Sequence, residues 1–446
     1  MAENTWTSLT SDEKRAARIE RWRNPAIPFA SPEGEADYKA RVDRLVAALS
    51  LQKPDRVPVN LNIGLWPTSR VGMTPYDAFS DTARAAEAWL EFMTRFQADT
   101  MVSPLLCPPA PASMYEALDY KLYAWPGHGV AKEGGHQYNE AEWMLAEDYD
   151  ALISDPSNYL LRTYLPRTVG AFAGFANMSS LFDFIELPFV PLNVGAWGSP
   201  EMTAGLEAMA AASRALGGWG QIMGPMIGKA MGLGFPMYAS TGTKAPFDIL
   251  GDTLRGTKGI ILDMFRRPKK VQAACERLVE VAIDWAVHRP GTLGTPLVFM
   301  PLHKGADGFM SDEQFHTFYW PTLRAVIMGL IDEGLIPFLF AEGRYATRLE
   351  AIMDLPKGKT VWQFDQTDMG RAKQTIGQVA CIQGNVPLSL TYAGTPERTA
   401  EYVRALIDAA GEGGGFILDV GAVNDAGKDE NLDAMIQTAK QYGVYQ

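Results

Sequence analysis

Polar side chains capable of acid–base chemistry, metal binding or anion binding follow several apolar runs in the second half of the chain. Short apolar runs of four to six residues are typical of strands buried on both faces. The carboxyl ends of parallel strands meet at one edge of a sheet, so we expect the side chains that follow the runs to share a pocket. In chain order these side chains are His303 with Lys304, Glu342 with Arg344 and Arg348, Asp365 with Gln366 and Asp368, Asn385, and Asp419.

We predict that His303, Glu342 and Asp365 are the catalytic residues. Their side chains are suitable ligands for a divalent metal such as zinc. They could equally be general acids and bases, with the pKa of a buried carboxylate raised by its surroundings. Residue types alone do not separate these two alternatives. Any single member could also be an ordinary loop residue, and Asp368 has the position of a helix N-cap.

The remaining polar residues at these positions are expected to bind the substrate. Cationic side chains would hold an anionic substrate or stabilise developing negative charge. Lys244, which follows a predicted strand at 235–240, adds a cation from an earlier part of the chain. The predicted substrate-binding residues are Lys244, Lys304, Arg344, Arg348, Gln366 and Asn385.

The elements that must position these residues form eight predicted strand–helix units. An early strand at 56–62, a helix and a second strand at 99–103 begin the pattern, which resumes at 235–240 and stays regular to the end. Eight such units indicate a single (β/α)8 TIM barrel of the α/β class. The remaining predicted strands are 297–302, 336–341, 360–364, 379–382 and 416–418.

Two regions fall outside this alternation. Residues 1–50 contain two amphipathic helical stretches and are predicted to be an N-terminal helical extension of a barrel that spans 51–446. Residues 105–234, between the second and third strands, form a long insertion rich in Pro, Gly, Trp and Tyr. A connection of this length in a barrel is usually functional, so we expect a cap over the active-site face.

Composition narrows the class of protein. The chain has 446 residues, of which 47% are hydrophobic and 21% charged, as in a globular protein. Its polar N-terminus resembles neither a signal peptide nor a membrane span, and we expect a cytoplasmic location. The net charge of −12 argues against nucleic acid and anionic membranes as partners. The three cysteines are Cys107, Cys275 and Cys381; they are far apart and are expected to be small core residues.

Several segments resemble the uroporphyrinogen decarboxylase superfamily, in order and spacing, from about residue 40 onward. The resemblance implies a (β/α)8 barrel with its pocket at the carboxyl ends of the strands, and it implies a homodimer. The superfamily contains porphyrinogen decarboxylases and methyltransferases that work with corrinoid proteins, some with coenzyme M or folate as the methyl acceptor. The matching segments are PDRVPV (54–59), APFDILGDTLRGT (245–257), GLIPFLFAEG (334–343), CIQGNVP (381–387), GTPERTAEYVRALI (394–407), GGGFIL (413–418) and ENLDAMIQTAKQYG (430–443).

The chain departs from both branches of the superfamily. Decarboxylases carry an arginine-rich element after the first strand, where this chain has only Arg70, and an aspartate after the second strand, where it has Leu106. Thiol-methylating members use a His-x-Cys pattern, which here becomes Phe340 and Glu342. Their later cysteine falls near Ala422, within Val-Gly-Ala. The site is therefore predicted to be rich in oxygen ligands, without a zinc–thiolate centre.

Two enzymatic hypotheses and one non-enzymatic hypothesis follow. The first is methyl transfer, in which a small methylated or methoxylated compound is demethylated with a corrinoid or folate as acceptor. Since the chain has no corrinoid-binding signature, a corrinoid would arrive on a separate protein. The second is a decarboxylase or related lyase acting on a carboxylated substrate. The third is a carrier role, such as binding a tetrapyrrole or corrinoid without turnover.

Overall fold

The computed structural model describes residues 6–101, 109–178, 184–239, 241–288 and 294–446. At its centre lies a parallel sheet in which neighbouring strands follow the order β4-β5-β6-β7-β8-β9. The strands from β6 to β9 are buried along their whole length, including the polar residues of β8 and β9. The strand bounds are β4 (Thr241–Gly242), β5 (Leu297–Leu302), β6 (Ile336–Ala341), β7 (Val361–Phe364), β8 (Cys381–Val386) and β9 (Phe416–Val420).

The first predicted strand pairs with the last strand of this sheet. Backbone hydrogen bonds run from the N–H of Asn60 to the carbonyl of Leu418 and from the N–H of Leu418 to the carbonyl of Pro58, both at 2.9 Å. A parallel bridge between Val59 and Leu418 has the same register. The sheet is therefore continued beyond β9 by the segment around residues 57–60.

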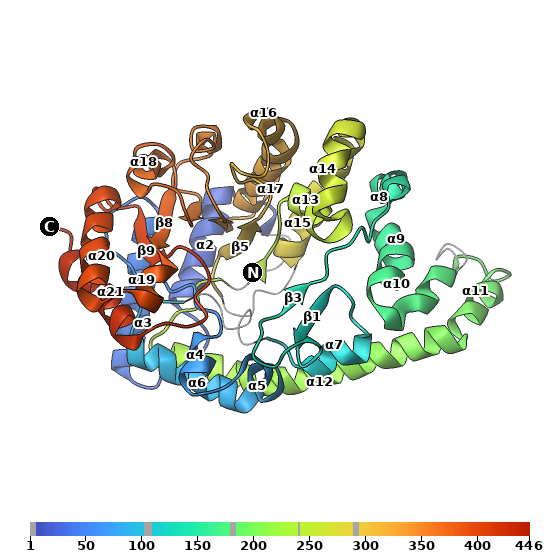
Figure 1. Ribbon diagram of the computed structural model, residues 1–446, viewed down its shortest axis with the longest axis horizontal. Helices are drawn as coiled ribbons and strands as arrows, with labels where there is room; N and C mark the ends of the chain where they lie inside the picture. The colour runs from blue at the N-terminus through green and yellow to red at the C-terminus, as the bar shows by residue number, and fades with distance from the viewer. Residues whose placement is uncertain (1–5, 102–108, 179–183, 240, 289–293) are drawn as a thin grey trace.

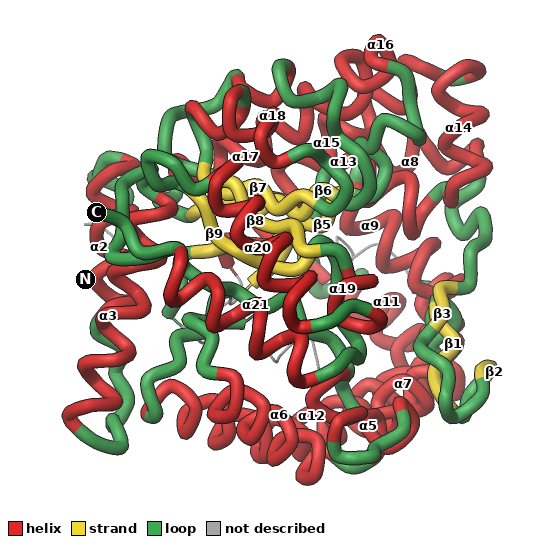
Figure 2. The backbone as a smooth tube through the Cα atoms, turned by 60° about the vertical axis from the view of Figure 1, so that its left-hand side comes forward, coloured by secondary structure: helices red, strands yellow, loops and turns green. Residues whose placement is uncertain are grey.

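The second predicted strand completes the ring. The backbone N–H of Asp99 donates to the carbonyl of Val59 at 3.0 Å. The hydroxyl of Thr100 donates to the carbonyl of Pro236 at 2.6 Å, just ahead of β4. Neighbouring segments thus close a barrel, and the predicted (β/α)8 TIM fold is confirmed. Figure 2 shows the strands gathered in the middle with helices around them.

Some strand boundaries differ from the predicted ones. The predicted strands at 379–382 and 416–418 extend further, so that Asn385 lies inside β8 and Asp419 inside β9. Residues 235–239 are not assigned to a strand, and residues 102 and 103 of the predicted second strand lie outside the described part of the chain. Cys275 and Cys381 are buried, as expected, whereas Cys107 also lies outside it.

Helices cover the outside of the barrel (Figure 1). Many begin with a side-chain cap, as at α20, where Thr395 accepts from the N–H of Arg398 and proline occupies the first turn. In the part of the chain that the structure describes, no helix is both long and apolar enough to cross a membrane. The main helices outside the insertion are α2 (Ser11–Arg23), α3 (Pro32–Leu49), α4 (Trp66–Arg70), α5 (Pro75–Ser80), α6 (Thr82–Phe96), α13 (Pro246–Asp248), α14 (Gly256–Arg266), α15 (Pro268–His288), α16 (Asp312–Gln314), α17 (Trp320–Asp332), α18 (Met369–Gln374), α19 (Leu388–Ala393), α20 (Pro396–Ala410) and α21 (Asp429–Tyr442).

The region between the second and third strands has its own secondary structure. Figure 1 shows its long helix α12 along the lower edge of the molecule, beside α6 and α7, with α11 at the far end. A small sheet of three short strands lies nearer the barrel. The elements are α7 (Ala112–Leu118), β1 (Tyr123–Pro126), β2 (Gly129–Val130), β3 (Gln137–Tyr138), α8 (Tyr149–Ser154), α9 (Pro156–Tyr159), α10 (Leu165–Thr168), α11 (Val190–Trp197) and α12 (Pro200–Gly232).

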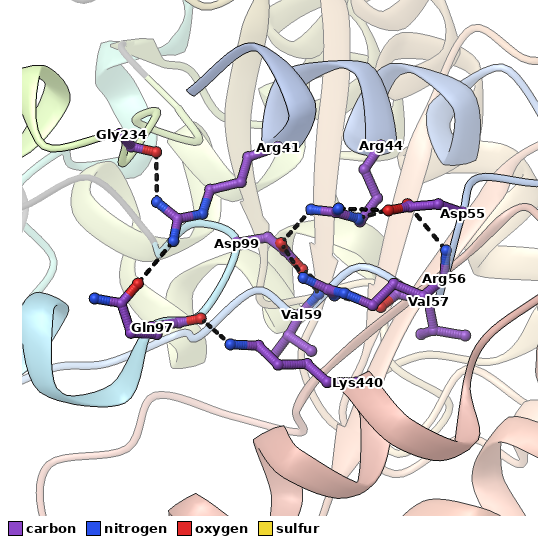
Figure 3. Close-up of polar contacts among 10 residues, drawn as sticks. All are labelled: Arg41, Arg44, Asp55, Arg56, Val57, Val59, Gln97, Asp99, Gly234 and Lys440. Atoms are coloured by element: carbon purple, nitrogen blue, oxygen red, sulfur yellow. Dashed lines mark hydrogen bonds and ion pairs between the residues drawn. The ribbon is translucent and has the colours of Figure 1, made fainter. Parts of the chain in front are cut away.

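A buried ion cluster holds the amino-terminal face of the barrel together (Figure 3). Asp99 is fully buried and accepts hydrogen bonds from Arg44 and Arg56, each at 2.7 Å. Its carboxylate also accepts from the backbone N–H of Val59 at 2.8 Å. Because Arg44 belongs to α3, the cluster ties an N-terminal helix to the first two strands. This face is at the opposite end of the strands from the predicted pocket. Charged residues there are expected to stabilise the barrel and not to take part in catalysis.

Candidate active site

A polar cavity of about 290 Å³ lies at the carboxyl ends of the strands. Lys244 follows β4, His303 and Lys304 follow β5, and Glu342 follows β6, so four predicted site residues line it. We call this the polar cavity. Its remaining lining residues are Asp252 and Thr253, from a π-helical turn at 249–254, Thr257, and Tyr123, Tyr138 and Glu140 from the insertion.

His303 is held between two carboxylates. Its Nδ1 lies 2.6 Å from Oδ2 of Asp252, and its Nε2 lies 3.4 Å from Oε1 of Glu342. Burial alone would lower the pKa of His303, but the hydrogen bonds to Asp252 and Glu342 outweigh it and raise this pKa to about 10. The imidazole is therefore a cation at neutral pH, with a proton to donate.

Asp252 contacts all three cationic side chains of the polar cavity, although it is not among the predicted site residues. Its carboxylate contacts Lys244 Nζ at 2.6 Å and Lys304 Nζ at 3.5 Å in addition to His303. Burial would raise the pKa of Asp252, but the hydrogen bond from His303 and the charge of Lys244 lower it to about 2. Three cationic side chains thus share one carboxylate, which remains ionised.

Asp248 lies beneath the cavity and positions its wall. Its two oxygens accept from the backbone N–H groups of His303 at 3.2 Å and Lys304 at 2.9 Å, and from the hydroxyl of Tyr319 at 2.6 Å. Full burial, with the charge of Asp252 nearby, raises the pKa of Asp248 to about 6. Sequence analysis missed both aspartates because they lie on helical turns after β4. The available signal was their spacing of four residues, which places both on one face of a helix.

Asp365, Gln366 and Asn385 line a different, wider cavity of about 810 Å³. Oδ2 of Asp365 accepts from the backbone N–H of Gly343 at 3.1 Å and from the amide of Gln366 at 3.2 Å. Burial raises the pKa of Asp365, and the nearby charge of Glu342 adds to this effect. The Asn385 amide is committed to the carbonyls of Asp365 and Thr367. These residues therefore do not join His303 in one cavity.

The two predicted arginines have different positions from those expected. Arg348 is 1% exposed, donates to the carbonyls of Gly305 and Met310, and pairs with Asp312. It is a structural residue, which corrects the expectation that it binds substrate; an arginine in the turn after a strand can point into the protein as readily as into a pocket. Arg344 is exposed and lines none of the cavities described in this section.

Two further aspartates, Asp368 and Asp419, make hydrogen bonds that stabilise the fold. Asp368 caps α18 by accepting from the N–H of Arg371 at 2.7 Å. Asp419 is fully buried and accepts from the side chains of Asn60 at 2.7 Å and Gln383 at 2.8 Å. Burial raises the pKa of Asp419 to about 6. It joins β9 to the first strand inside the barrel rather than reaching the mouth.

A metal centre formed by His303, Glu342 and Asp365 does not fit this geometry. The Nδ1 of His303 is occupied by Asp252, and Asp365 lines a different cavity from His303 and Glu342. In the described part of the chain, no three His, Cys, Asp or Glu side chains are grouped in a way that could hold an ion. The predicted metal set is therefore not assembled, and the residues of the polar cavity fit acid–base chemistry.

Comparisons with known proteins agree with this architecture. Residues 227–442 match the family model of uroporphyrinogen decarboxylase (URO-D). The uroporphyrinogen decarboxylase of Pseudomonas syringae pv. syringae (strain B728a) is 27% identical over 146 residues, which cover 31% of this chain and 40% of that protein. That of Azoarcus sp. (strain BH72) is 27% identical over 140 residues, covering 30% and 38%. The chain thus matches about two fifths of the length of these curated relatives.

A solved structure resembles nearly the whole chain. A methyltransferase from Methanosarcina mazei aligns with a TM-score of 0.57 and 15% sequence identity, covering 90% of this chain and 98% of its own. At this identity the likeness concerns the fold. The match over residues 227–442 contains the residues of the polar cavity that follow the barrel strands, which are Lys244, Asp252, His303, Lys304 and Glu342. Residues 227–442 therefore resemble the uroporphyrinogen decarboxylase family, and the chain as a whole shares its fold with the methyltransferase structure.

Proposed function

We propose that this chain is a methyltransferase that demethylates a small methylated or methoxylated compound and passes the methyl group to a corrinoid or folate acceptor. The observation that carries the proposal is the position of His303, which lies between the carboxylates of Asp252 and Glu342 at the wall of a small polar cavity. A heteroatom that loses its methyl group needs a proton, and a positioned cationic imidazole can supply it.

The residues have separate roles in this scheme. The bond from oxygen to the methyl carbon breaks with its electron pair remaining on oxygen, and the new bond to carbon uses an electron pair of the acceptor. His303 donates its proton to the departing oxygen, while Lys244 and Lys304 stabilise the negative charge that develops there. Asp252 and Glu342 hold the imidazole in place and keep it charged. Asp365 accepts from the backbone N–H of Gly343, the residue after Glu342, and would act through that contact.

The cations of the cavity also support this choice over porphyrinogen decarboxylation. In the described part of the chain, the polar cavity is lined by lysines and a histidine and by no arginine. Arg70 pairs with Glu91 at 2.6 Å and Asp429 at 2.8 Å instead. A cavity of about 290 Å³ suits a small molecule rather than a substrate with four pyrrole rings and many carboxylates.

The alternative is a carboxy-lyase that acts on a small carboxylated substrate. Two observations favour it: the matched relatives carry the name uroporphyrinogen decarboxylase, and Lys244, Lys304 and His303 could together hold a carboxylate. Breaking the bond to the carboxylate carbon would leave its electron pair on the substrate carbon, which His303 would protonate. Both reactions use the same acid, so the products must separate them.

The test is a product assay on purified protein with matched variants. Methoxylated and carboxylated small molecules are incubated with reduced cobalamin or tetrahydrofolate, and methylated acceptor and carbon dioxide are both measured. We expect methylated acceptor, and His303→Gln and Glu342→Gln are each expected to lower its rate by about a hundredfold or more. Glu350→Gln, which changes a surface carboxylate paired with Arg371, is the control. Carbon dioxide without methylated acceptor would support the alternative and overturn the proposal.

The domain organisation and the assembly belong to the same proposal. Residues 1–50 would form an extension of the barrel at 51–446, and residues 105–234 would cap its mouth, since Tyr123, Tyr138 and Glu140 line the polar cavity. A separate corrinoid protein would deliver the acceptor.

We also propose that the chain forms a homodimer. An apolar surface on α11 and α12 supports this: Leu192 is 75% exposed, and Leu206, Met209 and Leu216 are each more than 40% exposed.

The dimer can be tested by its molar mass in solution. Light scattering on wild type should give twice the mass of the chain, and Met209→Glu with Leu216→Glu should give the monomer at micromolar concentration. Exposed Phe265, which lies on α14, provides a matched control as Phe265→Glu. A wild-type mass equal to one chain would contradict the dimer and leave the proposed reaction unaffected.

A further inference from the structure

The turn that carries Asp252 ends in a row of backbone carbonyl groups. Residues 249–254 are π-helical, and the N–H of Arg255 donates to the carbonyl of Leu250 at 2.8 Å. The last carbonyl groups of a helical turn have no hydrogen-bond partner within it. Here they are, in chain order, the carbonyls of Asp252, Thr253 and Leu254. Groups that bind these carbonyls also hold the residue whose carboxylate contacts His303.

Each of the three carbonyls accepts a hydrogen bond from the insertion. The hydroxyl of Tyr138 donates to the first, that of Asp252, at 2.8 Å. The hydroxyl of Tyr164 donates to the second at 2.6 Å, and the backbone N–H of Met144 donates to the third at 2.8 Å. Three successive acceptors of the barrel are therefore satisfied by a region that lies far from them in sequence.

Residues 138–144, which we call the cap segment, also contact the residues that follow the turn. Oε1 of Glu140 accepts from the backbone N–H of Thr257 at 2.7 Å. Gly256 has a φ of +70°, and a Cβ at this position would lie 2.9 Å from the carbonyl oxygen of Ala141. The cap segment therefore lies against the backbone of the turn at a distance that only glycine allows.

A buried arginine joins the cap segment to the helix after the turn. Arg255 is 2% exposed, and its guanidinium donates to the carbonyl of Met144. The same guanidinium pairs with Asp263 of α14 at 2.6 Å and with Glu142 of the cap segment at 3.1 Å. The turn is thus held on its outer side by the insertion and at its end by α14.

The form of the turn decides where the carboxylate of Asp252 points. A π-helical turn holds more residues than an α-helical one, so the two forms place the fourth residue after Asp248 at different angles about the helix axis. Without donors for its last carbonyls, the turn could relax toward the commoner α-helical form. The carboxylate would then leave Nδ1 of His303, which it contacts at 2.6 Å.

We propose that Tyr138 and Tyr164 are positioning residues, which hold the π-helical turn in the form that directs the carboxylate of Asp252 to Nδ1 of His303. The insertion thereby completes the acid of the barrel in addition to lining the polar cavity. The effect on the reaction rests on the proposed function, in which His303 is the acid. The effect on the contact does not.

The first test observes the contact directly and needs no substrate. A proton in a short hydrogen bond between an imidazole nitrogen and a carboxylate gives a far-downfield signal in the proton NMR spectrum, and the signal absent from His303→Gln is assigned to Nδ1. We expect it in the wild-type chain, and we expect its loss or an upfield shift in Tyr138→Phe and in Tyr164→Phe. Each variant keeps the ring and removes one donor. A wild-type spectrum without the signal, or an unchanged signal in both variants, would overturn the proposal.

Tyr159→Phe is the matched control for these variants. Tyr159 also belongs to the insertion, but its hydroxyl donates to Asp148 at 3.3 Å and not to the turn. Thermal unfolding shows that each variant is folded. Tyr159→Phe should leave the downfield signal unchanged, and a loss of the signal in all three variants would mean that any disturbance of the insertion moves it, which would contradict a specific role for Tyr138 and Tyr164.

The second test uses the rate of the reaction. Tyr164 lines neither the polar cavity nor the wider cavity, so Tyr164→Phe should lower kcat about tenfold while KM changes by less than about twofold. A normal kcat in a variant that has lost the downfield signal would overturn the positioning role.

Failure of this inference and failure of the proposed function give different results. The expected NMR changes without methyl transfer by any form of the chain would retain the hold on Asp252 and remove the proposed function. Methyl transfer with a normal kcat in both phenylalanine variants would retain the reaction and remove the inference.

Discussion

The Nδ1 of His303 lies 2.6 Å from Oδ2 of Asp252, a contact that joins the end of β5 to the π-helical turn after β4. The same carboxylate meets Lys244 and Lys304, and the opposite ring nitrogen faces Glu342. The imidazole is therefore fixed on both sides, which sets its orientation and its charge together. In the proposed reaction this contact makes His303 an acid over the whole neutral range.

The stability of the chain should depend on pH through this pair. The pKa of His303 is raised to about 10, so its contribution is complete below the unfolded value of about 6.5 and is lost as pH rises through 10. The pKa of Asp252 is lowered to about 2, so its contribution is complete above about 3.8 and is lost as pH falls through 2. The difference in unfolding free energy between wild type and His303→Gln, measured in urea, should be largest between pH 4 and 6.5 and smaller at pH 9.5. A difference that grows toward pH 9.5 would contradict the raised pKa.

Asp248 should act as a positioning residue for His303 and Lys304. In Asp248→Asn, one of the two acceptor oxygens is replaced by a donor, so at least one backbone N–H or the hydroxyl of Tyr319 loses its partner. We expect a loss of about 1–3 kcal/mol in unfolding free energy and a lower kcat with KM little changed. Tyr319→Phe removes a single hydrogen bond and should cost about 1 kcal/mol. If Asp248→Asn kept full kcat, the two backbone contacts would not matter for the reaction.

The same substitution of the two arginines after β6 should change the unfolding free energy by very different amounts. Arg348→Met leaves the partly buried Asp307 without its neighbour and the carbonyls of Gly305 and Met310 without a donor, so we expect a loss of about 3 kcal/mol or more in unfolding free energy. Arg344→Met, at an exposed position, should change it by less than about 0.5 kcal/mol. Chemical denaturation of both variants checks this. Equal effects would mean that Arg348 is not the structural residue described above.

The ion cluster around Asp99 should affect stability without affecting the reaction. Asp99→Asn leaves Arg44 and Arg56 without their shared carboxylate at the amino-terminal face, and we expect a loss of about 3–5 kcal/mol. The rate of the product assay, measured well below the melting temperature, should be unchanged because the polar cavity is at the other end of the strands. A large fall in that rate with normal stability would assign the cluster a role in function.

The sequence predicts the barrel well because the strands are short apolar runs separated by clear turns. Two predicted strands, 297–302 and 336–341, coincide with β5 and β6. The predicted ends of β8 and β9 come too early because Gln383 and Asp419 are polar, yet both side chains have hydrogen-bond partners inside the barrel. A polar residue therefore indicates the end of a buried strand only in a barrel whose interior has no hydrogen-bonded polar side chains.

The sequence predicts the site only in part, because tertiary contacts decide where some of its side chains point. His303, Lys304 and Glu342 follow strands, and their side chains reach a common cavity, as the rule about strand ends predicts. Asp252 lies on a π-helical turn, so its spacing from Asp248 could suggest a shared helix face but not its contact with His303. The direction of Arg348 depends on a tertiary contact with Asp312 and so could not be predicted locally. The role of the insertion's tyrosines required the folded arrangement of β1 and β3 over the barrel.

The measurement that tests the central claim most directly is the titration of His303 by NMR. The chain has 5 histidines, so selective labelling of the imidazole carbons gives few signals, and the one absent from His303→Gln is assigned. We predict that this signal titrates with a pKa near 10 in the wild-type chain and moves toward 6.5 in Asp252→Asn. A wild-type pKa near 6.5, unchanged by Asp252→Asn, would contradict the account of His303 as an acid that its two carboxylate neighbours keep charged at neutral pH.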